Sequence, residues 1–371
     1  MNSIRTVLCV AVLTVVSLAQ AGAQDVPPVR VLAAVDVYDD GDELLLPVVI
    51  GGRTYRFGVD TGSSVTLYDR SLTNLFQTPA INAAIAGISL TLRRGAALDM
   101  ATSRKLGGHD VRGLVGMDFL RGYVLRIDFD AGKLFFLSAA EPEGDAVPLV
   151  FRYGGRPVVQ ADITGWRSEP FVIDTGYVSN TSGFIEARLF DRLVAAGIGM
   201  EPVETKVVWV AGGEKSHVEA LFRGMTLAKR QHSSLAFGRH PNVNLLGLNY
   251  LARYRVTFDF PNAVMYLKPS RQFGRRDGRD KTGLHLSRPD GRTIVESVDV
   301  ESPAARVGVK SGDHLVRLDD LDCDSMRLYA LRRSLAHCGG DIAVELLRGG
   351  ERFMLRIDGS KDVNSAEDGE M

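Results

Sequence analysis

Short runs in which apolar and polar residues alternate cover most of the chain between residues 30 and 269. This period of two is typical of β-strands that bury one face. Helical spacing is rare and predicts only short helices near 69–76 and 185–196, and an amphipathic helix near 326–336. The chain is therefore expected to be mainly β.

The strand pattern occurs twice with the same ending. A first apolar run leads into Asp60-Thr61-Gly62-Ser63, and a second leads into Asp174-Thr175-Gly176. An internal repeat predicts two structural units of the same kind. We expect an N-terminal lobe over 30–140 and a C-terminal lobe over 147–269.

Each copy continues in the same way after its aspartate. Two apolar residues and a glycine follow at 114–116 and at 245–247. Two strands separated by a turn come next, at 124–136 and at 254–267. The matched order of these motifs strengthens the prediction of paired lobes.

Two neighbouring aspartates can activate water to hydrolyse a peptide bond. Like charges at contact distance do not both ionise, so one carboxyl keeps a proton. The ionised carboxylate draws a proton from water, and the protonated carboxyl donates to the carbonyl oxygen. Asp60 and Asp174 are the candidate pair. The sequence leaves open which of them is protonated, because the pair titrates as a unit.

The residues beside each aspartate suit this geometry. Gly62 and Gly176 leave room for backbone N–H groups near the carboxylates. Thr61 and Thr175 offer short hydroxyls that can bond to the opposite loop, and Ser63 can donate to the outer oxygen of Asp60. The alternative is that both aspartates only cap turns, which does not account for the matched lobes.

These motifs resemble the pepsin–retropepsin family of aspartic proteases. The resemblance covers both lobes, and the chain is similar to bacterial exported retropepsin-like proteins that carry a PDZ domain. It implies a two-lobed acid-protease β-barrel pseudo-dimer, followed by a PDZ-like α+β domain. It also implies an aspartic endopeptidase that needs neither a cofactor nor a metal.

Two features depart from the family pattern. Tyr177 stands where a small residue is usual, and it would either point into a substrate pocket or weaken the site. The flap is uneven, because only the second lobe has a clear β-hairpin, with Trp209, Gly212 and Gly213 near its tip. This hairpin would cover a substrate, or it is an ordinary surface hairpin. In the first lobe, residues 87–94 are only a weak candidate for a matching flap hairpin.

The region 282–358 has a different pattern. Strands near 293–300, 314–318, 342–348 and 352–357 surround the amphipathic helix, and Ser-Pro-Ala-Ala followed by Gly and Gly-Asp fills 302–313.

This layout resembles the bacterial PDZ family. By resemblance, Gly283, Leu284, His285 and Leu286 form the carboxylate-binding loop, where a C-terminal peptide would add as a strand. The alternative is a domain that only covers the protease.

Connecting and terminal segments complete the organisation. The segment 270–281 is basic and poor in apolar residues, which predicts an exposed linker. The tail at 359–371 is polar and acidic, which predicts disorder.

At the N-terminus, Arg5, an apolar run and small residues predict a signal peptide over 1–23. An uncleaved anchor is the alternative, although the apolar run is short for a bilayer span.

Export changes the interpretation of the cysteines. Cleavage after residue 23 would leave only Cys323 and Cys338. Two cysteines in a periplasmic or extracellular protein predict one disulfide, and two buried thiols are the alternative.

Composition narrows the partners. The formal net charge of −1 gives no electrostatic reason to expect nucleic acid or an anionic membrane. We therefore expect a protein or peptide substrate, a C-terminal peptide ligand at the PDZ-like domain, and no stable membrane insertion after cleavage of the signal. Two lobes in one chain indicate that a monomer suffices, and a dimer is the alternative. A catalytically silent peptide-binding scaffold on the same fold is the second hypothesis.

Overall fold

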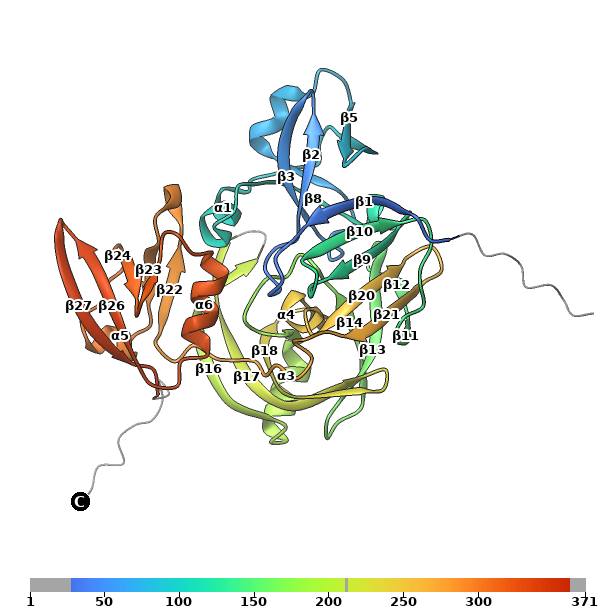
Figure 1. Cartoon of the computed structure of the whole chain (residues 1–371). Helices are drawn as coiled ribbons and strands as arrows, with labels where there is room; N and C mark the ends of the chain where they lie inside the picture. The colour runs from blue at the N-terminus through green and yellow to red at the C-terminus, as the bar shows by residue number, and fades with distance from the viewer. Residues whose placement is uncertain (1–27, 211–212, 361–371) are drawn as a thin grey trace, which may run out of the picture.

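The computed structural model describes residues 28–210 and 213–360. Within these residues the chain is mainly β and forms four sheets (Figure 1). Two lobes, which contribute strands to a sheet that joins them, are followed by a smaller α+β domain. The predicted fold class is therefore confirmed.

The first lobe is built on a seven-stranded sheet. Its β3 (Arg53–Val59) pairs antiparallel with β2 (Leu45–Ile50) and parallel with β8 (Val111–Val115). In β2, Leu46 and Val48 are buried while the residues that follow them are exposed, as expected of a strand with one buried face. The remaining strands of this sheet are β4 (Leu67–Asp69), β5 (Ala80–Ile85), β6 (Ile88–Arg93) and β7 (Ala97–Leu98).

The second lobe repeats this arrangement in an eight-stranded sheet. Its β14 (Ser168–Ile173) pairs antiparallel with β13 (Arg156–Ile163) and parallel with β19 (Leu245–Leu246). These pairings match those of β3 with β2 and β8. The remaining strands are β12 (Val150–Arg152), β15 (Gly183–Glu186), β16 (Gly199–Val210), β17 (Gly213–Leu227) and β18 (Arg230–His240).

A six-stranded antiparallel sheet joins the lobes. At its centre β9 (Val124–Asp128) pairs with β20 (Tyr254–Asp259), and Ile127 lies opposite Val256. Both of these side chains are buried. The lobes thus meet along equivalent strands. The outer strands are β1 (Val31–Asp36), β10 (Lys133–Leu137), β11 (Asp145–Pro148) and β21 (Val264–Pro269).

The α+β domain has a separate core. Its sheet begins at the edge strand β22 (Leu284–Ser287), and α6 (Leu328–Ala336) buries Leu328, Leu331 and Leu335 in that core. Spacing of three and four residues places these leucines on one helix face. The remaining strands are β23 (Ile294–Val298), β24 (His314–Leu318), β25 (Leu321–Asp322), β26 (Asp341–Arg348) and β27 (Glu351–Asp358).

The helices are short, as the sequence predicts. The helix expected near 69–76 is the 3-10 helix η1 (Arg70–Leu75). The other helices are α1 (Ala101–Gly107), α2 (Met117–Leu120), α3 (Ala187–Ala195), α4 (Leu248–Leu251), α5 (Pro303–Arg306) and the 3-10 helix η2 (Pro289–Gly291).

The segment 270–281 is packed, so the prediction of an exposed linker is wrong. The Asp277 carboxylate accepts hydrogen bonds from Arg253 Nη2 (2.5 Å), Ser182 Oγ (2.7 Å) and the Ala236 N–H (2.9 Å). The Arg253 and Asp277 side chains are both 0% exposed. Basic composition gave the wrong expectation because a buried ion pair of this kind is invisible in composition.

The predicted disulfide is also absent from the described residues, where both cysteines are free thiols. Cys323 is buried in the core of the α+β domain, and burial raises the pKa of its thiol to about 12. Cys338 instead directs its thiol to the Gly340 carbonyl, 2.8 Å away. The packing of the two side chains, which sequence spacing does not encode, decides the outcome.

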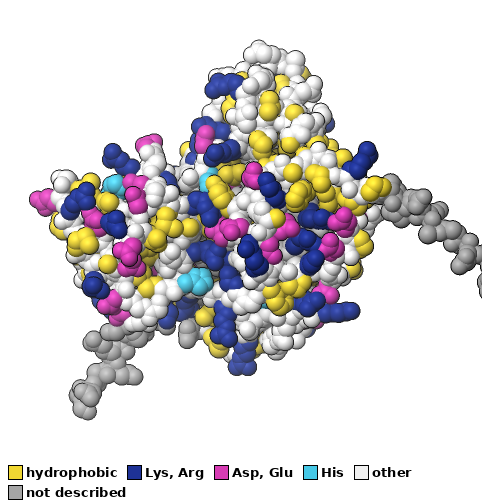
Figure 2. Space-filling model, viewed as in Figure 1, with side chains coloured by type: hydrophobic (Ala, Val, Ile, Leu, Met, Phe, Trp, Pro, Cys, Tyr) yellow, Lys and Arg dark blue, Asp and Glu magenta, His cyan; other side chains and the backbone are white. Residues whose placement is uncertain are grey.

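Some expectations concern residues that the structure does not describe. The predicted signal peptide (1–23) lies outside the described residues, as does the predicted tail from residue 361. Between residues 28 and 360, the described part contains no helix that is both long and apolar enough to span a bilayer. Figure 2 shows basic and acidic side chains mixed over the visible face.

The buried Arg253–Asp277 pair should contribute strongly to stability. We expect Asp277→Ala to lower the free energy of unfolding by about 3–5 kcal/mol, because it leaves the Arg253 charge buried without a partner. Chemical denaturation measures the change. Asp191→Ala is the matched control, since Asp191 pairs with Arg239 at the surface, and it should change stability by less than about 1 kcal/mol. Equal effects of the two substitutions would contradict the assignment.

Candidate active site

The two Asp-Thr-Gly turns meet between the lobes. Asp60 follows β3, and its N–H donates to the Val115 carbonyl of β8 (3.0 Å). Asp174 follows β14, and its N–H donates to the Leu246 carbonyl of β19 (2.9 Å). Each aspartate is therefore fixed by the parallel strand beside its own. Rigid strands of this kind hold a site more accurately than free loops do.

Threonine hydroxyls connect the two turns. Thr61 Oγ1 donates to the Ile173 carbonyl, and Thr175 Oγ1 donates to the Val59 carbonyl, both at 2.7 Å. Each hydroxyl also accepts the backbone N–H of the other threonine, at 3.0 and 3.1 Å. Both threonines are at most 1% exposed. Four buried hydrogen bonds related by a pseudo-two-fold axis thus hold the turns together.

The glycines leave room for the carboxyl groups to face each other. A Cβ on Gly62 would lie less than 3.0 Å from the carboxyl of Asp174, and a Cβ on Gly176 less than 3.0 Å from that of Asp60. Side chains do not tolerate such an approach. Only glycine fits at these two positions while the opposite aspartate stays in place.

The two carboxyl groups share a hydrogen bond and differ in protonation. Burial, and then the charge of Asp174, raise the pKa of Asp60 well above its ordinary value. Burial also raises the pKa of Asp174, but the Gly176 N–H (2.9 Å) and the charge of Arg156 oppose this effect. We therefore assign the shared proton to Asp60 and the negative charge to Asp174. Such a pair has the arrangement that water activation requires.

The apolar-apolar-Gly segments pass behind the turns. The Met117 N–H donates to the Ser63 carbonyl (2.9 Å), and the Leu248 N–H donates to the Tyr177 carbonyl (3.0 Å). A Cβ on Gly116 or on Gly247 would lie less than 3.0 Å from the loop that follows each aspartate. These two segments thus support the turns in the same way in both lobes.

The expected role of the Ser63 hydroxyl is wrong. Its Oγ donates to the Val65 carbonyl (2.7 Å), within its own turn. The backbone N–H of Ser63, rather than the hydroxyl, bonds to the Asp60 carboxyl. The hydroxyl turns away because a nearby carbonyl satisfies it locally.

Tyr177 does not crowd the aspartates. Its phenol bonds to Thr181 Oγ1 (2.7 Å), and its ring packs against Phe184 with 4.7 Å between ring centroids. The side chain is 8% exposed, and burial raises its pKa above the ordinary value. It lies against Gly247, whose missing Cβ makes the room. Tyr177 thus forms part of the wall of the cavity described next.

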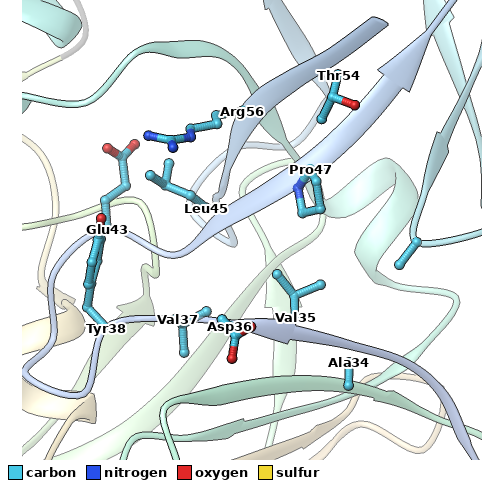
Figure 3. A pocket seen from close by; sticks show the side chains of 11 residues that line it. Ala34, Val35, Asp36, Val37, Tyr38, Glu43, Leu45, Pro47, Thr54 and Arg56 are labelled. Carbon is cyan, nitrogen blue, oxygen red and sulfur yellow. The ribbon is translucent and has the colours of Figure 1, made fainter. Parts of the chain in front are cut away.

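A cavity of about 280 Å³ opens over the two aspartates. Its wall comes from both lobes, and includes Leu98, Met100 and Ser103 near the start of α1. Glu43, just before β2, also lines a larger neighbouring pocket of about 500 Å³ (Figure 3). The cavity wall comprises Glu43, Asp60, Gly62, Leu98, Met100, Ser103, Val111, Leu114, Arg156, Val172, Asp174, Gly176, Tyr177, Val178, Phe184, His240, Val243 and Leu245.

The predicted hairpin of the second lobe forms from β16 and β17. Val210 pairs with Gly213 at its end, and Trp209 lies in β16. Gly212 lies outside the described residues. In the first lobe, β5 and β6 form a smaller hairpin around Ala86 and Gly87. The substrate-covering role of Trp209, Gly212 and Gly213 stays a prediction.

Hydrogen bonds within the α+β domain close its predicted carboxylate-binding loop. The Leu284 N–H donates to Thr282 Oγ1 (3.2 Å), and the Gly283 carbonyl accepts from the Asp299 N–H (2.9 Å). His285 Nε2 lies 3.0 Å from the Asp299 carboxylate. An acidic side chain at this loop disfavours a second carboxylate there.

The α1 helix covers part of the same surface. The Arg288 N–H, directly after β22, donates to the Lys105 carbonyl (2.7 Å). Arg332 of α6 donates to the Leu106 carbonyl (2.7 Å) and to the Leu286 carbonyl of β22 (2.6 Å). In Figure 1, α1 accordingly lies between the first lobe and α6. The predicted peptide groove is thus bonded to the first lobe.

The sequence did not reveal a polar network that joins α6 to the cavity. Arg327, at the start of α6, donates to Asp42 (2.9 Å), and Asp42 lies 3.2 Å from His109 Nε2. Burial opposes ionisation of both groups, but their hydrogen bond raises the pKa of His109 and lowers that of Asp42. Burial raises the pKa of the adjacent Glu43 to about 7. Only sequence position could have indicated this network, because Asp42 and Glu43 lie just before β2.

Among the described residues, no group of three His, Cys, Asp or Glu side chains is arranged to hold a metal ion. The paired aspartates are arranged as one protonated and one ionised carboxyl group that share a hydrogen bond.

Comparison with known proteins gives partial matches. No known protein-family model matches the chain. It is similar to syntenin-2 of Rattus norvegicus and of Mus musculus, with 30% identity over 73 residues in each case. These residues are 20% of this chain and 25% of each relative, so the chain spans about a quarter of their length. A retropepsin-like aspartic protease from Rickettsia conorii is similar in structure, with 14% identity and a TM-score of 0.26, over 34% of this chain and 93% of that one.

The raised pKa of Glu43 predicts a pH-dependent loss of stability. Between pH 4.5 and about 7 the unfolded chain ionises Glu43 while the folded chain keeps it protonated, so stability falls as pH rises through this window. We expect Glu43→Gln to remove that fall and to be more stable than the wild type at pH 7, by about 3 kcal/mol at most. Denaturation of both proteins across this pH range measures it, and parallel pH profiles would contradict the assignment.

Proposed function

We propose that the chain is an aspartic endopeptidase that cleaves peptide bonds in proteins outside the cytoplasm. The observation that carries the proposal is the half-buried, hydrogen-bonded pair of Asp60 and Asp174, held by the crossed threonine hydrogen bonds and open to a cavity between two lobes.

The reaction follows from the protonation of the pair. A water molecule between the carboxyl groups gives a proton to Asp174 as its oxygen attacks the peptide carbonyl carbon. Asp60 gives its proton to the carbonyl oxygen, and a tetrahedral diol forms. When the diol collapses, one of its hydroxyls returns a proton to Asp60, the carbon–nitrogen bond breaks, and the leaving nitrogen takes a proton from Asp174. No covalent intermediate with the protein forms.

The dyad should be essential as a unit. We expect Asp60→Asn and Asp174→Asn each to lower kcat/KM for peptide cleavage by about a thousandfold or more, because neither single carboxyl can both accept and donate a proton. Asp290→Asn, at an exposed position on η2, is the control and should keep full activity. A transition-state-mimic inhibitor of aspartic proteases should block the wild type.

Two outcomes would contradict this function. Wild-type activity in either dyad variant would remove the aspartates from the chemistry. Intact peptide binding without cleavage in the wild type would favour the silent peptide-binding scaffold.

We also infer that the α+β domain controls access to the cavity. A peptide strand can add to β22 only if α1 moves away from it, because the Lys105 and Leu106 carbonyls already accept hydrogen bonds from this surface. Met100 and Ser103, at the start of the same segment, line the cavity over the aspartates. Displacement of one end of α1 therefore alters the cavity wall at the other end.

A single charge reversal tests this coupling. The Lys105 ammonium pairs with Glu296 of β23, so Lys105→Glu should loosen α1. We expect faster hydrogen exchange at 101–107 and 284–287, and a several-fold rise in kcat/KM. Lys133→Glu is matched, because Lys133 pairs with Asp36 and is equally exposed at 42% against 41%. Faster exchange with unchanged kcat/KM would make α1 a purely structural contact.

A further inference from the structure

Glu43 and Arg156 occupy equivalent positions in the two lobes. Leu45 of β2 pairs with Gly58, two residues before Asp60. Val158 of β13 pairs with Val172, two residues before Asp174. Glu43 lies two residues before Leu45, and Arg156 lies two residues before Val158. The pseudo-two-fold axis that relates the aspartates therefore relates an acidic side chain to a basic one.

Both side chains line the cavity over the dyad. A Cβ placed on Gly58 would lie 3.0 Å from Glu43 Oε1, so this carboxyl lies over the strand that leads to Asp60. The charge of Arg156 acts on Asp174 and helps to keep it ionised. The two groups thus lie on opposite sides of the site of bond cleavage, one in each lobe.

Each group feels a nearby charge without bonding to it: His109 acts on Glu43, and Arg156 acts on Asp174. Among residues 28–210 and 213–360, neither side chain forms a hydrogen bond or ion pair with another residue. Arg156 Nε is buried without an acceptor. Burial alone accounts for most of the rise in the pKa of Glu43. Both side chains are partly exposed where they line the cavity, so a charged group of a bound ligand has access to each of them.

An extended peptide across a two-fold cleft presents successive side chains to both lobes. A basic side chain that reached Glu43 would receive a counter-charge, and so would an acidic side chain that reached Arg156. The neighbouring apolar wall, with Leu114, Val172 and Leu245, fits the residues at the scissile bond.

We propose that Glu43 and Arg156 determine specificity by charge, so that the preferred substrate carries a basic residue on one side of the scissile bond and an acidic residue on the other. The inference rests on the proposed proteolytic function. Opposite charges at equivalent positions also fix the direction in which the peptide lies, which a symmetric cleft would leave free.

Short synthetic peptides with an apolar scissile pair test the proposal. One set carries Lys on one side and Glu on the other, in both orders, and the reference carries Gln on both sides. We expect the wild type to cleave one order of the charged peptide with kcat/KM at least about tenfold above the Gln peptide, and to disfavour the reverse order.

Variants assign the preference to the two residues. Glu43→Gln should lose the preference for Lys alone, and Arg156→Gln the preference for Glu alone. The double variant Glu43→Arg with Arg156→Glu should prefer the reverse order. Equal cleavage of all peptides by the wild type would overturn the proposal, as would a uniform loss of activity in both single variants with unchanged ratios, which would assign them to the dyad or to folding.

Binding separates this inference from the proposed reaction. Fluorescence polarisation with the same peptides and the Asp60→Asn chain reports charge preference without cleavage. A preserved order preference in binding, with no cleavage by the wild type, supports the charge pair and rejects the proteolytic function. Cleavage by the wild type together with equal binding and equal cleavage of all peptides rejects only the charge pair.

Discussion

The crossed hydrogen bonds of Thr61 and Thr175 are the constraint on which the site depends. Each hydroxyl donates to the strand that leads to the opposite aspartate, so neither turn can move without the other. Because the two residues are buried, water cannot replace these bonds. The same contact brings two acids close enough to share a proton, which is unfavourable for isolated carboxylates. The hydrogen bonds that fix the two turns therefore also place the two carboxyl groups close enough to share a proton.

The sequence predicted the parts that are encoded by repetition. The Asp-Thr-Gly motifs and the apolar-apolar-Gly segments gave two similar lobes, because a strand that ends in a tight turn needs glycine wherever another chain passes closely. Gly62, Gly176, Gly116 and Gly247 all meet that requirement. The mainly β fold followed from alternation of apolar and polar residues. Motifs that occur twice in the sequence thus occupy equivalent positions in the two lobes.

The expectations that failed concern contacts between distant segments. Asp277 lies in a basic, polar stretch, and only the folded chain shows that Arg253 and Ser182 reach it. The thiols of Cys323 and Cys338 are directed to different surroundings, although export favours a disulfide. Composition and cellular compartment predict the average behaviour of a segment or of a class of proteins. These two outcomes depend instead on where single side chains lie in the folded chain.

The repeat is most informative where it is broken. If both lobes carried the same residue before the first strand, the cleft would be symmetric and two peptide directions would be equivalent. Glu43 and Arg156, at equivalent positions in the cavity wall, instead differ in chemical character. Asp42, beside Glu43, is in turn bonded to Arg327 of α6, which has no counterpart in the second lobe. The α+β domain is also bonded to the second lobe, where Asn180 Nδ2 donates to the Arg332 carbonyl. On the side of the first lobe, Asp42 links the α+β domain by hydrogen bonds to His109 and lies next to Glu43, which lines the cavity.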